Sequence, residues 1–205
     1  MIQREELLKD GTVSIETVDR AVANVLRMKY RLGLFSQPYA QKVTHRTESK
    51  EHLDVALKAA RESAVLLKNN GVLPFDPGKK MTVLLTGPLS NARYDQLGTW
   101  DMDGDTSIVS TPKTAFLSLG VENVKVIYIP GLEYSRDKDK SNWKAVAKAA
   151  KKADAIIVCL GEEQILSGEA HSLADIGLKG AQTEYVEFLS SFGKPLIATV
   201  MSGRA

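Results

Sequence analysis

Three glutamates in the segment 161–172 are the side chains of this sequence best suited to proton transfer. Glu162 and Glu163 stand at its start, and Glu169 lies further along, between a glycine and an alanine that let a backbone approach a ligand closely. A carboxyl group in a partly desolvated cleft has a raised pKa and donates a proton near neutral pH, which cleavage of a glycosidic bond requires. Glutamates in surface loops are more often simply solvated, so the spacing alone selects no reaction.

Trp100 is a second residue that could contact a ligand. It ends the segment Leu97-Gly98-Thr99-Trp100, in the long stretch that follows the first predicted strand. An indole in such a loop can stack on a sugar ring, and the alternative is a tryptophan buried in the core or at a domain interface.

The sequence predicts no metal site and no cofactor. The run 101–105 opens like a calcium-binding loop, but Thr106 replaces the turn glycine and Pro112 replaces the closing glutamate. Cys159 is the only cysteine, which excludes a cysteine-built metal site and an intrachain disulfide. No H-E-x-x-H motif joins the three histidines, which are His45, His52 and His171.

Nucleotide binding and serine hydrolysis also lack their motifs. Gly87-Pro88 follows the first predicted strand without the G-x-G-x-x-G spacing, and no G-x-x-x-x-G-K-[ST] occurs. Ser167 is not part of a G-x-S-x-G elbow, because Ile165 occupies the first glycine position.

Short apolar segments that alternate with helical patterns predict the elements that would position these residues. Strands apolar on both faces belong in a sheet that is covered on both sides, and strand–helix–strand order predicts a mostly parallel sheet. Ligands of such sheets bind beyond the carboxyl ends of the strands. The predicted strands are 81–86, 124–129, 155–160 and 196–201, with helices at 141–152 and 181–192 and strand-end loops that begin at Gly87, Pro130, Gly161 and Ser202.

The first part of the sequence predicts helices without a sheet. Residues 1–34 are largely helical in pattern, with Thr12 or Ser14 as the N-cap and Gly33 at the C-terminal end. Residues 35–48 lack periodicity and predict a linker, and residues 49–68 predict an amphipathic helix.

The composition excludes several classes of protein. Of the 205 residues, 43% are hydrophobic and 25% charged, which is typical of a globular domain and not of a disordered chain. The net charge of +2 comes without a dense basic block, so nucleic acid is not an expected partner. No membrane span is expected, because no window approaches the roughly 20 apolar residues that one needs. The acidic N-terminal segment, with Glu5 and Glu6, does not resemble a signal peptide.

Four separated segments stand out by their order along the chain. They are 25–35 (VLRMKYRLGLF), 60–69 (ARESAVLLKN), 168–170 (GEA) and 193–195 (GKP). Together they closely resemble glycoside hydrolase family 3, the β-glucosidase and β-xylosidase family. The resemblance covers nearly the whole chain, and several motifs in the right order make it specific.

The resemblance implies an α/β fold with a mostly parallel sheet flanked by helices, an α/β sandwich, preceded by a helical remnant of a (β/α)8-type barrel domain. On this basis residues 1–36 are the helical end of the N-terminal barrel, residues 37–48 are a linker, and residues 49–205 are most of the C-terminal sandwich. The remainder of the barrel is expected to lie outside this sequence.

The resemblance also implies roles for individual residues. The family's Ser-Gly-Glu-Ala motif falls on residues 167–170, which makes Glu169 the proton donor and later the base. The family's G-x-W element falls on residues 98–100, which implies that Trp100 stacks against the leaving-group side of the substrate. The family's nucleophile is an aspartate on the barrel, and no residue of this chain takes that place.

The predicted function is therefore that of a fragment of a retaining, exo-acting β-glycosidase that hydrolyses terminal non-reducing β-D-glycosyl residues. Its expected partners are a β-linked oligosaccharide, or an aryl or alkyl β-glycoside, and the barrel domain. The isolated chain is expected to be inactive, because a retaining glycosidase needs two carboxyl groups about 5 Å apart. The alternatives are a stand-alone, non-catalytic α/β module that binds a carbohydrate or a partner chain, and a degenerate gene product. The sequence does not determine the compartment, and a periplasmic or secreted parent enzyme is compatible with it.

Overall fold

The computed structural model describes residues 2–39, 49–76, 78–118, 120 and 122–203. The chain divides into two compact units, residues 1–67 and 68–205. Most of the predicted linker at 37–48 lies outside the described residues. No helix in the described part of the chain is long and apolar enough to cross a membrane.

The first unit is helical, as the sequence predicts. It contains α1 (Ile2–Lys9), α2 (Ile15–Arg31) and α3 (Lys50–Glu62). Ser14 caps α2, because its hydroxyl accepts a hydrogen bond from the Thr17 backbone N–H at 3.2 Å. Gly33 follows the C-terminal end of α2 with a φ of 72°, a left-handed conformation that glycine adopts without steric cost.

Helix α3 is shorter than the helix predicted at 49–68. Ser49 caps its N-terminus as expected, but the helix closes at Ser63, whose hydroxyl donates to the Ala60 carbonyl at 2.8 Å. The next apolar residues, Val65 to Leu67, are exposed. The helix therefore ends several residues before the end of the predicted apolar stripe.

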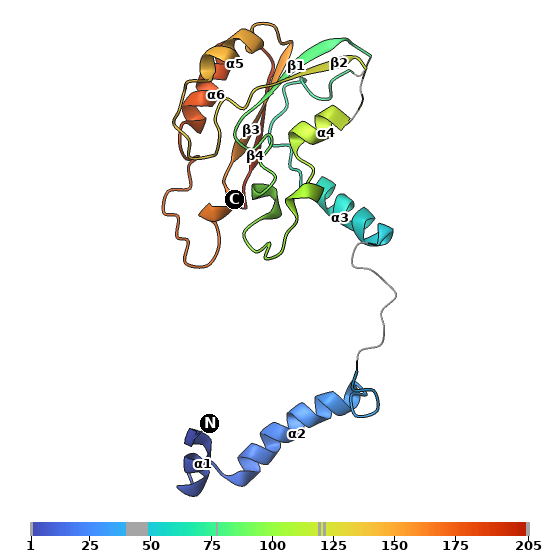
Figure 1. Cartoon of the computed structure of the whole chain (residues 1–205), viewed down its shortest axis with the longest axis vertical. Coiled ribbons are helices and arrows are strands. Elements are labelled where there is room, and N and C mark those ends of the chain that lie inside the picture. Colours follow the sequence, from blue (N-terminus) through green and yellow to red (C-terminus); the bar gives the residue numbers. More distant parts are fainter. Residues whose placement is uncertain (1, 40–48, 77, 119, 121, 204–205) are drawn as a thin grey trace. The chain divides into compact units, whose positions relative to one another are not determined.

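The second unit contains a four-stranded parallel sheet in which the strands have the order β2-β1-β3-β4 (Figure 1). The prediction of an α/β fold with a parallel sheet is therefore confirmed, and each strand lies within a residue or so of its predicted position. Strand β4 is one edge of the sheet, and residues 198–200 within it are exposed. The strands are β1 (Met81–Thr86), β2 (Val124–Tyr128), β3 (Ala155–Gly161) and β4 (Leu196–Met201).

Helices cover both faces of this sheet. Helices α5 (Trp143–Ala150) and α6 (Gln182–Ser190) pack on one face, and α4 (Pro112–Ser118) packs on the other (Figure 1). Strand β3 is buried along its whole length because its side chains alternate between the two layers. Ile156, Val158 and Leu160 point toward α5 and α6, whereas Ile157 and Cys159 contribute to the opposite layer. Burial raises the pKa of the Cys159 thiol to about 11.

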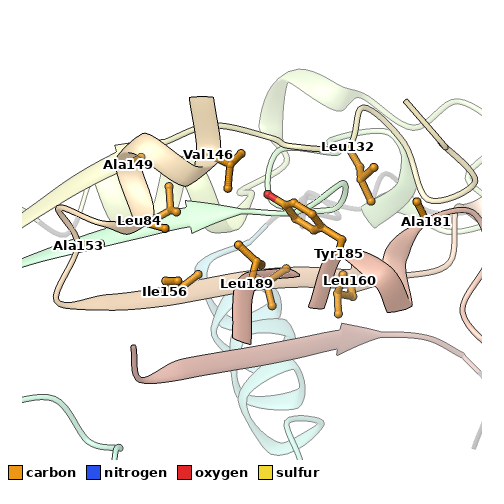
Figure 2. Packing of buried hydrophobic residues seen from close by; sticks show 12 residues of the cluster. Leu84, Leu132, Val146, Ala149, Ala153, Ile156, Leu160, Ala181, Tyr185 and Leu189 are labelled. Carbon is orange, nitrogen blue, oxygen red and sulfur yellow. The ribbon is translucent and has the colours of Figure 1, made fainter. Parts of the chain in front are cut away.

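Tyr185 lies at the centre of the layer beneath α5 and α6 and is fully buried (Figure 2). Its ring packs against Trp143, with ring centroids 5.1 Å apart, and its hydroxyl lies 2.5 Å from the Thr86 hydroxyl at the end of β1. There is no room for a side chain at Gly131, because a Cβ there would lie 1.9 Å from the tyrosine oxygen. This contact joins α6 to the carboxyl ends of β1 and β2.

Helix α4 was not predicted from the sequence, although its start carries a signal. Thr111 is the N-cap, since its hydroxyl accepts a hydrogen bond from the Thr114 backbone N–H at 3.1 Å, and Pro112 takes the first helical position. The helix is short, so its apolar pattern is too brief to show a period of 3.6 residues.

Gln182 connects three segments at the carboxyl end of β3. Its side chain is fully buried, and its Oε1 accepts a hydrogen bond from the Gly161 backbone N–H at 2.9 Å. Its Nε2 lies within donor distance of the carbonyl oxygens of Gly161 (2.9 Å), Ser135 (2.9 Å) and Lys179 (3.1 Å). One amide therefore holds the end of β3, the loop after β2 and the segment that leads into α6.

We expect Gln182→Leu to lower the free energy of unfolding by about 2–5 kcal/mol, because several buried backbone groups lose their partner. Urea denaturation of the 205-residue chain measures this change. Gln96→Leu, at an exposed position, is the matched control and should change the free energy by less than about 0.5 kcal/mol. Equal effects of the two substitutions would show that the buried amide does not hold the strand ends together.

Candidate functional site

A pocket of about 410 Å³ lies beyond the carboxyl ends of β3 and β4. Its walls come from three segments: the loop after β1, the loop after β3 and the residues that follow β4. Asp95, Thr99 and Trp100 line it from the first segment, and Glu162 and Glu163 line it from the second. This is the place at which a parallel sheet is expected to bind a ligand.

Trp100 lines this pocket, and 68% of the residue's surface is exposed to solvent. The indole therefore does not belong to the core of the second unit, which was one of the alternatives from the sequence. Its exposed ring beside carboxylates is a combination suited to sugars, which present C–H faces and hydroxyl groups.

Glu169 is exposed and lies on a tight turn directly after the part of the loop that lines the pocket. The turn is closed by His171, whose backbone N–H donates to the Gly168 carbonyl at 3.2 Å and whose Nδ1 lies 3.1 Å from the Ser167 carbonyl oxygen. Gly168 and Ala170, on either side of Glu169, have positive φ angles of 119° and 62°. A positive φ is unfavourable for alanine, and such conformations are concentrated at functional sites.

Gly168 brings the turn into contact with the loop after β1. A Cβ at this position would lie 2.5 Å from the Thr99 methyl group and 3.9 Å from the Trp100 ring. Only glycine fits such an approach. The structure thus brings the Glu169 turn and the Trp100 segment together, although they are far apart in the sequence.

Gln164 attaches the loop after β3 to the loop after β1. Its backbone N–H donates to Asp95 Oδ1 at 3.0 Å, and its carbonyl accepts from the Thr99 hydroxyl at 3.0 Å. Burial raises the pKa of Asp95 above the usual carboxyl range, the hydrogen bond from Gln164 opposes this rise, and the negative charge of Glu163 adds to it.

Glu163 attaches the same loop to the loop after β2. Its carboxylate accepts hydrogen bonds from the Ser135 hydroxyl at 2.7 Å and from Arg136 Nε at 3.0 Å. Burial by itself would raise the pKa of Glu163, but the hydrogen bonds from Arg136 and Ser135 and the guanidinium charge outweigh it, so the pKa is lowered. Glu163 is therefore an anchored carboxylate whose ionised form these neighbours favour.

Glu162 attaches the loop to β4. Its backbone N–H donates to the Met201 carbonyl at 3.0 Å, and its Oε2 accepts from the Ser202 hydroxyl at 3.2 Å. The three glutamates that the sequence placed in one group thus have different surroundings. Glu162 and Glu163 line the pocket and are bound to neighbouring loops, and Glu169 is presented on the turn beside it.

Three residues that hold the loop after β3 were not predicted from the sequence: Asp95 of the loop after β1, and Ser135 and Arg136 of the loop after β2. The start of each loop was identified as a strand end, but no residue type or spacing in the sequence connects them to Glu163 or Gln164. The aspartate run at 101–105 also has a local role, because the Asp105 carboxylate accepts from the Ser107 backbone N–H at 2.7 Å. Among the described residues, no three His, Cys, Asp or Glu side chains form a group that could hold a metal ion.

Comparison with known proteins finds a consistent set of relatives. Residues 64–205 match the family profile of the glycosyl hydrolase family 3 C-terminal domain. The chain is 31% identical to the periplasmic β-glucosidase of Salmonella typhimurium, over 97% of this chain and 29% of that protein. It is also 31% identical to a β-xylosidase of Formosa agariphila, over 99% of this chain and 29% of that protein.

Solved structures show the same likeness. The chain superposes on the β-glucosidase of Listeria innocua in complex with glucose with a TM-score of 0.83 and 32% identity, covering 98% of this chain and 27% of that one. An exo-β-xylosidase in complex with a xylobiose aziridine probe gives a TM-score of 0.75 at 27% identity, covering 95% of this chain and 25% of that one. The chain spans less than a third of the length of these relatives.

The lowered pKa of Glu163 predicts how stability depends on pH. A folded-state pKa below the unfolded value stabilises the fold above the ordinary carboxyl pKa, and this contribution disappears as the pH falls through the lowered pKa. We expect Glu163→Gln to destabilise the 205-residue chain by about 1 kcal/mol at pH 7, since Arg136 is half-exposed. The difference from the wild type should shrink toward pH 3.

Urea denaturation at pH 7, 5 and 3 measures this difference. Glu187→Gln, at an exposed position on α6, is the control, and its effect should be small and constant over the same range. A difference for Glu163→Gln that grows as the pH falls would contradict the assigned direction of the pKa.

Proposed function

Because the chain belongs to glycosyl hydrolase family 3, we propose that it is a part of a retaining, exo-acting β-glycosidase, to which it supplies Glu169 as the general acid/base. The observation that carries this proposal is the position of Glu169. It stands in a Ser-Gly-Glu-Ala sequence, on a tight turn held against the loop that carries Trp100, beside a pocket at the strand ends.

In the first step of this mechanism, the nucleophilic carboxylate bonds to the anomeric carbon as the bond from that carbon to the glycosidic oxygen breaks, and Glu169 gives its proton to the departing oxygen. In the second step, the Glu169 carboxylate takes a proton from a water whose oxygen bonds to the anomeric carbon, and the bond from that carbon to the nucleophile breaks. Donation near neutral pH requires a desolvated surrounding. We propose that the bound substrate and the partner domain provide it.

The carboxylate that attacks the anomeric carbon lies outside this chain in our proposal, on a barrel domain. Residues 1–36 are proposed to be the helical end of that barrel, residues 37–48 the linker and residues 49–205 the sandwich domain. A retaining enzyme needs both carboxyl groups in one site. The 205-residue chain by itself is therefore expected to show no measurable hydrolysis.

Trp100 is proposed to stack on the leaving-group part of the substrate. Its exposed ring lines the pocket and lies close to Gly168, the residue before Glu169. The names of the relatives, β-glucosidases and β-xylosidases, support β-linked gluco- and xylo-oligosaccharides and aryl or alkyl β-glycosides as substrates. Both sugars have equatorial hydroxyl groups and C–H faces that a tryptophan can cover.

We expect Glu169→Gln to lower kcat by about 10²–10⁴-fold for substrates with poor leaving groups, and far less for substrates with good ones, since a good leaving group needs little protonation. The enzyme for this test is the Listeria innocua β-glucosidase in which this chain replaces the segment that it matches. Rates are compared for dinitrophenyl and methyl β-glucosides, with Glu187→Gln as the control.

An equal loss for both leaving groups would argue against an acid/base role of Glu169. If, in addition, the 205-residue chain bound cellobiose without hydrolysing it in any context, the alternative of a non-catalytic carbohydrate-binding module would be favoured.

Removal of the indole should weaken binding of the leaving-group sugar. We expect Trp100→Ala to raise KM for cellobiose by about 3–10-fold, because covering part of the apolar indole with a sugar contributes on the order of 1 kcal/mol. The KM for methyl β-glucoside, which has no second sugar, should change by less than twofold, and Trp100→Phe should retain most of the affinity. A similar rise of KM for both substrates would exclude a role of Trp100 on the leaving-group side.

A further inference from the structure

We propose that Asp95 and Thr99 are positioning residues for Glu169. Together they clamp the loop after β3 at Gln164 and at Gly168, and this clamp determines where the turn that carries Glu169 lies. The inference rests on the proposed acid/base function of Glu169, and it adds two residues from a different loop to the machinery of that reaction.

The first part of the clamp engages both polar groups of one residue. The Gln164 backbone N–H donates to Asp95 Oδ1, and the Gln164 carbonyl accepts from the Thr99 hydroxyl, each at 3.0 Å. The two hydrogen bonds hold both of the peptide groups that flank Gln164, whereas one bond would hold only one of them. Both partners come from the loop after β1, so the two loops must move together.

The second part of the clamp is a steric contact. The Thr99 methyl group lies so close to Gly168 that a Cβ there would be 2.5 Å away. The two branches of one threonine therefore have separate roles, since the hydroxyl holds Gln164 and the methyl group packs against the residue before Glu169. Valine would retain the packing without the hydrogen bond, and this separates the two roles experimentally.

The turn needs such support because its own interactions are local. Glu169 and the residues directly after it are exposed, and its closing hydrogen bonds run between residues 167–171 themselves. The turn also contains Ala170 in a left-handed conformation, which persists only where the surroundings enforce it. Glu163 anchors the start of the loop on the opposite side, to the loop after β2, so the loop is held from both sides before the turn begins.

The surroundings of Asp95 disfavour a carboxylate, which indicates that this side chain has a specific role. It is half-buried, it lines the pocket, and the negative charge of Glu163 acts on it. A carboxylate in such surroundings is unfavourable for stability by itself. Its observed contribution is the hydrogen bond that it accepts from Gln164.

Hydrogen exchange in the 205-residue chain tests the clamp without any activity. The reporters are the backbone amides of Gln164, bound to Asp95, and of His171, which closes the Glu169 turn. We expect Asp95→Ala and Thr99→Val to speed exchange at both amides by about tenfold or more. The Ile156 amide in β3, bonded to the Pro195 carbonyl, reports global unfolding and should not change.

Two variants serve as controls. Asp95→Asn retains an oxygen acceptor and should restore the slow exchange of Gln164 and His171. Asp103→Ala removes an exposed carboxylate from the same loop and should have no effect on either amide. If His171 exchanged at the wild-type rate in both clamp variants, the clamp would not reach the turn and the proposal would be wrong.

Comparing kcat for good and poor leaving groups in the chimeric β-glucosidase distinguishes a misplaced acid from a general loss of activity. We expect Asp95→Ala and Thr99→Val to lower kcat by about tenfold or more for methyl β-glucoside, and by less than about twofold for dinitrophenyl β-glucoside, because a misplaced acid affects only substrates that need protonation. Equal losses for both substrates, or a change confined to KM, would overturn the positioning role.

The same assays distinguish this inference from the proposed function. If Glu169→Gln shows no leaving-group dependence, the acid/base assignment fails, whatever the clamp variants do. If Glu169→Gln shows the dependence and the clamp variants do not, only the positioning role fails.

Discussion

The hydrogen bonds of the buried Gln182 side chain are the constraint on which the site depends. A single amide joins the end of β3, the loop after β2 and the segment before α6. Buried peptide groups at the ends of strands must find partners, since water cannot reach them. Gln182 supplies those partners from the first residue of α6, and in doing so it determines where the loop after β3 leaves the sheet.

The pocket follows from the parallel arrangement of the strands. All four strands end at the same edge of the sheet, so three loops that are far apart in the sequence meet there. Three neighbouring segments each bind a different residue of the loop after β3. The segment after β4 binds Glu162, the loop after β2 binds Glu163, and the loop after β1 binds Gln164. Three successive residues bind three different segments, and the turn that presents Glu169 follows them.

The two layers of the core connect the sheet to different segments of the chain. The layer beneath α5 and α6 holds Tyr185 against Thr86 and so connects a helix to the end of β1. The opposite layer, with Cys159 and Ile157, is formed with α4 and the loop after β1, which carries Asp95 and Trp100. Leu89 and Ala92 pack in this layer, so the start of that loop is attached to the sheet.

The sequence by itself determined the strands, the helices α5 and α6, the parallel sheet and the family, because each depends on the period of apolar residues or on short motifs within one segment. It also identified Glu169 and Trp100 as candidates. Only the tertiary structure decided that Asp95, Ser135 and Arg136 meet the loop of Glu169, that Thr99 contacts Gly168, and that the three glutamates have different surroundings. These contacts join residues about 30 to 70 positions apart, and no local pattern encodes a contact that exists only once the strands are aligned.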